Sequence, residues 1–258
     1  MNFIRSVGAK TLGFIQSLGS ITLFFLHILA KSGTAFARPH LSIRQVYFAG
    51  VLSVLIVAVS GLFVGMVLGL QGYTQLAKFK SADILGYMVA ASLLRELGPV
   101  LAAILFASSA GGAMTSEIGL MKTTEQLEAM NVMAVDPVAR VVTPRFWAGV
   151  FSMPLLASIF NVAGIYGAYL VGVEWLGLDG GIFWSQMQNN ITFHYDVLNG
   201  LIKSAAFGVA VTLIAVHQGF HCVPTSEGIL RASTRTVVSS ALTILAVDFM
   251  LTAWMFTD

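Results

Sequence analysis

The chain has 258 residues, of which 57% are hydrophobic and only 10% are charged, and its mean hydropathy is +0.83. Soluble domains carry about 25% charged residues, so this composition excludes an ordinary soluble domain. The formal net charge of +2 is too small to suggest a nucleic-acid partner, and a single cysteine, Cys222, excludes an intramolecular disulfide.

Residues 1–40 are predicted to form an amphipathic helix that lies on the cytoplasmic membrane surface. Its apolar residues repeat at alternating three- and four-residue steps and so share one face, whereas Lys10, Ser17 and Lys31 lie off that face. A cleavable signal peptide is the alternative, because the Ala-Phe-Ala run at 35–37 resembles a cleavage site. The most apolar stretch begins only after twenty residues, which is too late for a signal peptide. The predicted apolar face comprises Ile4, Val7, Thr11, Phe14, Leu18, Ile21, Phe25 and Ile28.

Five apolar stretches are long enough to cross a bilayer as helices, which takes about 20 residues each. Their helical periodicity and the lack of an alternating strand pattern favour helices over a β-barrel. We therefore predict an all-α, polytopic membrane protein with a five-helix transmembrane domain over 41–258. The stretches cover residues 46–70, 86–113, 146–173, 199–217 and 237–255.

The positions of lysine and arginine predict the orientation, because these residues concentrate in cytoplasmic loops. With five spans, ten of them lie on one side and only Lys78 and Lys80 fall in the opposite loops. The N-terminus is therefore predicted to be cytoplasmic and the C-terminus to lie outside. The ten residues are Arg5, Lys10, Lys31, Arg38, Arg44, Lys122, Arg140, Arg145, Arg231 and Arg235.

Small residues recur at four-residue spacing in the first two spans, which permits close approach of helices. We expect this spacing to serve tight packing inside one subunit rather than a dedicated dimer seam. The two series are Gly61, Gly65 and Gly69, and Ser108, Gly112 and Ser116.

Four charged residues lie within the predicted spans: Arg95, Glu96, Lys203 and Asp248. Charges at membrane depth face a bundle interior or a wet cavity, and they pair. Adjacent helical residues point about 100° apart, so Arg95 and Glu96 should each meet a different neighbour, with Lys203 and Asp248 as candidates. One alternative is a network that only locks the helices together. The other is a network that also lines a binding pocket.

The loop over 116–145 is the longest between two spans on the cytoplasmic side. Thr123 followed by Gln126 fits a capping box, and Asp136 followed by a proline predicts the start of a second short helix. Such an amphipathic helix suits docking into a partner's groove, or packing on its own subunit. Both alternatives are open on physical grounds. The apolar face of the first helix comprises Leu127, Met130 and Ala134.

A membrane-embedded enzyme and a secondary transporter are the rival classes. His217, His221 and Cys222 stand close in sequence, but no carboxylate motif or second histidine pair accompanies them, so we expect no metal site. Asp248 suggests a proton relay, yet no chain of titratable groups can be traced to it. The sequence also lacks a GxxxxGK[ST] phosphate loop, so any ATP hydrolysis must take place in another subunit.

The chain resembles the MlaE-type permeases through long, ordered motifs that extend from the first span to the last. The resemblance implies the permease subunit of an ABC transporter that moves phospholipid between the inner and outer membranes of Gram-negative bacteria. It also implies residence in the inner membrane, five transmembrane helices, an N-terminal interfacial helix and a homodimer. The motifs are LGLQGY (68–73), LLRELGP (93–99), SEIGLM (116–121), TEQLEAM (124–130), MAVDP (133–137), TPRFWAG (143–149) and PTSEGILRASTRTVV (224–238).

The resemblance further implies three protein partners. These are an ATPase subunit, a small STAS-domain protein on that ATPase, and a hexameric MCE-domain lipid-binding protein in the periplasm. ATP is then used by the ATPase, and this chain itself binds no cofactor. A cytoplasmic coupling helix seated in the ATPase is implied as well. By family match it contains Glu125, Gln126, Leu127, Glu128 and Met130.

The same resemblance gives the intramembrane charges a possible ligand. If the charge network lines an outward-facing pocket, Arg95 and Glu96 would meet a lipid head group, while Leu70 and Tyr73 would line the acyl-chain path. One position departs from the family. Related members usually carry arginine in an Ala-Gly-Arg-Ala-Gly run, whereas this chain has Ser109 in ASSAGG, so no role of that arginine is carried over.

Overall fold

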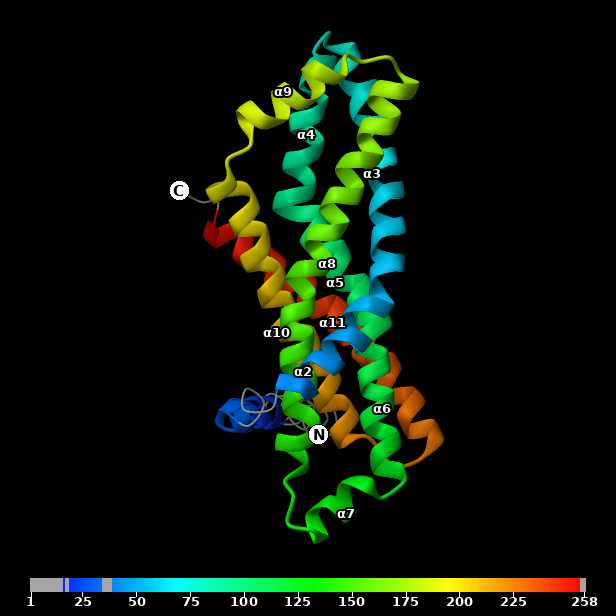
Figure 1. Ribbon diagram of the computed structural model, residues 1–258, viewed down its shortest axis with the longest axis vertical. Helices are drawn as coiled ribbons and strands as arrows, with labels where there is room; N and C mark the ends of the chain where they lie inside the picture. The colour runs from blue at the N-terminus through cyan, green and yellow to red at the C-terminus, as the bar shows by residue number, and fades with distance from the viewer. Residues whose placement is uncertain (1–15, 17–18, 34–38, 256–258) are drawn as a thin grey trace, which may run out of the picture.

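The computed structural model describes residues 16, 19–33 and 39–255. Within these ranges every regular element is a helix, which confirms the all-α prediction (Figure 1). In the part of the chain that the structure describes, five helices are long and apolar enough to cross a membrane, in the order predicted. They are Ile43–Lys78, Ala82–Thr123, Val138–Trp175, Phe193–His221 and Ser226–Met255.

The spans are longer than the predicted apolar stretches, because their helices continue past the lipid-compatible segment at one or both ends. Several also contain π turns, in which the helix widens by one residue. The first span begins within α2 (Pro39–Val46) and continues through η1 (Tyr47–Val51) and α3 (Leu52–Lys78). The second consists of η2 (Ala82–Ile84), α4 (Leu85–Ser92), η3 (Leu93–Leu97), α5 (Gly98–Phe106), η4 (Ala107–Gly111) and α6 (Gly112–Thr123).

The remaining elements complete the bundle, and α7 and α9 lie at its opposite ends (Figure 1). The short helix α7 (Gln126–Val132) leads to the third span, which contains η5 (Val138–Val142), α8 (Thr143–Tyr169) and η6 (Leu170–Trp175). The helix α9 (Gly180–Asn190) leads to the fourth, η7 (Phe193–Val197) and α10 (Leu198–His221). The fifth span is α11 (Ser226–Met255).

Glycines of the first span let α3 lie directly against α8. A Cβ atom on Gly65 would stand 1.8 Å from the carbonyl oxygen of Gly164, and one on Gly61 would stand 2.7 Å from that of Phe160. Any side chain at either position would therefore force the two helices apart. The series packs inside a single chain, as predicted from its spacing.

Two apolar cores stabilise the bundle. The larger core lies between the spans and includes Phe106, Phe160 and Phe207, all fully buried. The smaller core gathers at the end that carries α7. Its members come from the helix over 19–33, from α6, α7, η5, α8 and α10, and include Ile28 and Leu127.

The described part of the N-terminal segment, residues 19–33, is helical as predicted. It buries Phe24 and Ile28 in the smaller core, whereas Leu23 and Leu26 remain 70% and 54% exposed. Ile28 belongs to the face that the sequence assigned to the membrane, and here this face packs on protein. Most of the other predicted members, Ile4, Val7, Thr11, Phe14 and Leu18, lie outside the described residues.

The predicted start of α7 is wrong in its details. Thr123 still belongs to α6, where its hydroxyl donates to the Gly119 carbonyl, so it cannot cap the next helix. Glu125 precedes α7 in a left-handed conformation, with φ of 59°, and its side chain makes no capping hydrogen bond. Asp136 does cap a helix, because its carboxylate accepts from the Val138 amide at 2.9 Å. That helix is the third span itself rather than a separate short one.

Candidate functional site

A π turn in the second span, η3, contains Arg95 and Glu96 and ends just before Pro99. In a regular helix the amide at position 99 would donate to the carbonyl of Arg95, but proline has no N–H. The amide of Gly98 donates instead to the carbonyl of Leu93, five residues back. Pro99 therefore cannot donate to the carbonyl of Arg95, and this oxygen accepts from another element.

Lys203 of α10 occupies this position. Its Nζ donates to the Arg95 carbonyl at 3.1 Å and to the hydroxyl of Thr252 at 2.7 Å. It also forms ion pairs with Glu96 at 2.9 Å and with Asp248 at 3.5 Å. The Lys203 side chain is fully buried, so these oxygens replace water around the ammonium group. The structure thus brings Glu96, Lys203 and Asp248 together, as the sequence suggested.

Thr252 was not predicted and links two members of this cluster. Its hydroxyl accepts from Lys203 and donates to the Glu96 carboxylate, with Oγ1 3.2 Å from Oε2. It lies one helical turn beyond Asp248 on α11. A threonine in an apolar helix gives little signal by itself, although its spacing from Asp248 places both side chains on one face.

Arg95 has a partner that the sequence did not point to. Its Nε donates to a carboxylate oxygen of Asp196, in the π turn η7, and the other oxygen accepts from the Thr192 amide at 2.8 Å. Asp196 is fully buried. The sequence offered only Asp248 as a counter-ion for Arg95, and Asp196 was missed because the predicted fourth span began only at residue 199. The signal was an aspartate within three residues of that span.

The cluster is buried on one side and partly open on the other. The side chains of Arg95 and Glu96 are 33% and 37% exposed, whereas those of Lys203 and Asp196 are at most 1% exposed. One cation and one anion, adjacent in the second span, are thus each held by a buried counter-ion. Such a pair can contact a ligand that carries both charges.

Leu70 and Tyr73, the other predicted binding residues, lie on α3. Leu70 is 42% exposed, whereas Tyr73 packs partly against the larger core. Leu70 therefore offers apolar surface to lipid or to a second subunit, and Tyr73 mainly contributes to the fold.

The five residues of the predicted coupling helix divide into two groups. Leu127 is 5% exposed and Met130 is partly buried, and both pack in the smaller core. Glu125, Gln126 and Glu128 are exposed. The sequence had assigned Leu127, Met130 and Ala134 to one face. Leu127 and Met130 bind the chain's own core, whereas Ala134 lies beyond the end of α7 and is exposed.

Exposed apolar residues follow at the end of α7 and were not predicted. Val132 is 88% exposed and Met133 is 67% exposed. With the three polar residues they form a surface that we call the α7 tip, which consists of Glu125, Gln126, Glu128, Val132 and Met133. Both apolar residues are visible in the sequence. Their exposure could not be predicted, because it depends on where α7 ends and the chain turns.

The base of the loop contacts the N-terminal helix through Asp136. Its carboxylate forms an ion pair with Lys31 at 3.1 Å and lies 3.7 Å from Nε2 of His27. Partial burial acts to raise the pKa of Asp136, but the hydrogen bonds from Lys31 and the Val138 amide outweigh it and hold the pKa below its usual value. The indole of Trp147 adds a second link by donating to Ser32 at 2.9 Å.

Comparison with known proteins decides the family. The family model described as Permease MlaE matches residues 42–254. The chain belongs to this permease family. It is 54% identical to the intermembrane phospholipid transport system permease protein MlaE of Haemophilus influenzae, over 99% of this chain and 98% of that protein. It is 36% identical to a probable ABC transporter permease protein of Rickettsia felis, over 99% and 98%, and 32% identical to one of Synechocystis, over 83% and 81%.

Ser109 lies in the π turn η4 of the second span. The Ser109 hydroxyl lies 3.0 Å from that of Ser53 and donates to the Leu105 carbonyl at 2.8 Å. A pair of hydroxyl groups thus joins the first and second spans.

The histidines near the end of α10 contact the N-terminal helix. The rings of His217 and His221 stack at 4.3 Å, and Phe24 packs edge-on against both. Ser20 lies within hydrogen-bond distance of His217, at 3.2 Å. In residues 16, 19–33 and 39–255, no three histidine, cysteine or carboxylate side chains gather as a metal site would require.

Proposed function

We propose that this permease moves phospholipid between the inner and outer membranes as the membrane subunit of an ABC transporter. Family membership over nearly the whole chain carries the proposal, together with the phospholipid transport named for the Haemophilus relative. The protein would reside in the inner membrane, with a cytoplasmic N-terminus and a periplasmic C-terminus. The distribution of lysine and arginine supports this orientation.

ATP hydrolysis would take place in a partner ATPase, because the sequence has no GxxxxGK[ST] phosphate loop. The α7 tip would dock into that ATPase. Its exposed Val132 and Met133 can fill an apolar groove, and its polar residues can form the rim of the contact. A STAS-domain protein on the ATPase, a hexameric MCE-domain protein in the periplasm and a second copy of this permease would complete the assembly.

The partly exposed pair Arg95 and Glu96 would contact the lipid head group. A zwitterionic phospholipid carries one phosphate and one amine. An arginine can bind the phosphate, and a glutamate can bind the amine. Leu70 would contact an acyl chain through its exposed side, and Tyr73 would support that wall. The buried counter-ions Lys203 and Asp196 hold the pair in position.

The experiment is a pull-down of the ATPase with the purified permease, followed by lipid transfer in proteoliposomes with ATP. Replacing Val132 and Met133 together by Asp should release the ATPase and abolish ATP-dependent transfer, while membrane insertion stays normal. Loss of an apolar anchor costs about 2 kcal/mol, or roughly thirtyfold in affinity. Phe79→Asp, at an exposed apolar residue just after α3, is the matched control and should bind the ATPase normally.

Two results would contradict the proposal. If the double variant still pulled down the ATPase as well as the wild type does, the α7 tip would not be part of the interface. Lipid transfer by the permease alone, without ATP or an ATPase, would remove the ABC mechanism itself.

A further inference from the structure

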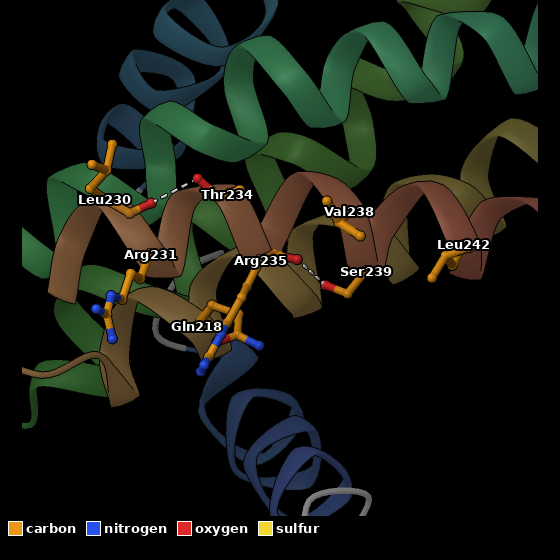
Figure 2. A pocket seen from close by; sticks show the side chains of 8 residues that line it. All are labelled: Gln218, Leu230, Arg231, Thr234, Arg235, Val238, Ser239 and Leu242. Carbon is orange, nitrogen blue, oxygen red and sulfur yellow. Dashed lines mark hydrogen bonds between the residues drawn. The ribbon is translucent and has the colours of Figure 1, made fainter. Parts of the chain in front are cut away.

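A groove of about 720 Å³ lies along α11, beside the end of α10 (Figure 2). It begins near the first turns of α11 at Leu230 and extends to Leu242. Gln218 of α10 lies at its side, next to the side chain of Arg235 (Figure 2). The arginine end of the groove lies towards the end of the bundle that carries α7, because α11 starts at that end (Figure 1).

The chemistry of the groove changes along its length. Arg231 and Arg235 both line the end near the start of α11, and the lining residues include no carboxylate. Glu227, outside the groove, pairs with Arg231, so the three residues together keep one positive charge. Farther along α11 the walls become apolar, with Val238 and Leu242 55% and 65% exposed.

This order matches the order of groups in a lipid molecule. Leu242 lies seven residues beyond Arg235, which is about 10 Å along a helix. Because α11 crosses the membrane, the arginines at its start lie at head-group depth, and Leu242 lies at the depth of the upper acyl chains. Basic pockets between transmembrane helices suit anionic head groups, and arginine binds phosphate through several donors.

We propose that this groove binds an anionic phospholipid of the adjacent leaflet, with its phosphate between Arg231 and Arg235 and an acyl chain along Val238 and Leu242. The site is distinct from the outward path at Arg95 and Glu96. The proposed site requires only that α11 crosses the membrane. It can therefore be tested independently of which lipid the permease transports. With the proposed orientation, the leaflet is the cytoplasmic one.

Native mass spectrometry of the purified permease, titrated with phosphatidylglycerol or phosphatidylcholine, tests the site. Each of Arg231→Gln and Arg235→Gln should weaken phosphatidylglycerol binding about fivefold, and the double variant about thirtyfold. Phosphatidylcholine binding should change little. Arg140→Gln, at an exposed arginine outside the groove, should bind like the wild type, and Arg235→Lys should retain most of the affinity.

Two further measurements identify the occupant. Leu242→Gln should also weaken phosphatidylglycerol binding, and soluble glycerol phosphate should fail to compete at equal concentration, because the acyl chain contributes to affinity. Val238→Cys chains should not cross-link to one another in membranes. An unchanged affinity of the double glutamine variant, competition by glycerol phosphate, or efficient cross-linking through position 238 would each overturn the proposal. The last result would assign the groove to a second copy of the chain.

Discussion

Lys203 and Lys31 both pair with carboxylates, but their surroundings differ completely. The Lys203 side chain is fully buried at membrane depth, whereas Lys31 is 42% exposed and its partner Asp136 is 32% exposed. A buried ion pair costs desolvation that only its partners offset, so removal of one partner is expensive. An exposed pair is screened by water and salt, and it contributes at most about 1 kcal/mol. The same contact therefore fixes the fold in one region and only adjusts it in the other.

The largest effect on stability is expected at the buried lysine, Lys203. Lys203→Met would leave Glu96 and Asp248 as adjacent uncompensated carboxylates, at a cost of about 3–5 kcal/mol. The yield of membrane-inserted, folded permease should fall sharply. Lys203→Met combined with Glu96→Gln and Asp248→Asn should restore that yield, because no charge is then left alone.

Transport separates the two interpretations of the cluster. If the triple variant recovers both yield and lipid transfer, the network only stabilises the fold. If it recovers yield without transfer, Glu96 contacts the lipid. Normal yield of Lys203→Met alone would contradict the importance of the buried charge.

A somewhat smaller effect is expected at the apolar base of α7. Leu127→Ala should destabilise the smaller core. Truncation of a buried leucine lowers the free energy of unfolding by about 2–5 kcal/mol, and we expect no more than that here. Hydrogen exchange across α7 should rise, whereas that of α8 should not. Val132→Ala is the control, because its side chain is already in solvent and its loss should leave exchange unchanged. Equal exchange in both variants would contradict the inward position of Leu127.

Asp196→Asn should have the next largest effect on stability. The effect is moderate because Arg95 keeps partial access to water when its partner loses its charge. A hydrogen bond between charged groups contributes about 1.5–3 kcal/mol, and the unfolding temperature of the purified permease should fall accordingly. Asp179→Asn is the matched control. Asp179 is an exposed N-cap of α9, and asparagine caps a helix as well as aspartate does, so stability should not change.

The smallest effect is expected at Asp136. Its folded-state pKa is lowered, so the stabilisation is complete at pH 7 and disappears only as the pH falls through that lowered value. Asp136→Asn keeps the cap on the third span but removes the ion pair with Lys31. Hydrogen exchange of residues 19–33 should rise by no more than about fivefold at pH 7, equivalent to about 1 kcal/mol. A rise of a hundredfold would show that this pair fixes the helix.

The sequence predicted the number of spans, their order and the meeting of Glu96, Lys203 and Asp248, because long apolar runs and isolated charges are strong signals in lipid. It did not predict Asp196 or Thr252, since their roles depend on where π turns place the second and fourth spans. It also assigned Leu127 to docking. An apolar residue on an amphipathic helix can face either its own core or a partner, and only tertiary packing decides between them.

The second span has a mechanical consequence. It holds 42 residues, which at 1.5 Å each is about 60 Å of nearly continuous helix, twice the roughly 30 Å thickness of a hydrocarbon core. Arg95 and Glu96 lie towards one end of this shaft, and α7 is attached to the other. A continuous helix transmits a change of tilt from one of its ends to the other. The π turns η3 and η4 are the places where this helix can bend. Force applied at α7 thus reaches the charged pair along one piece of backbone.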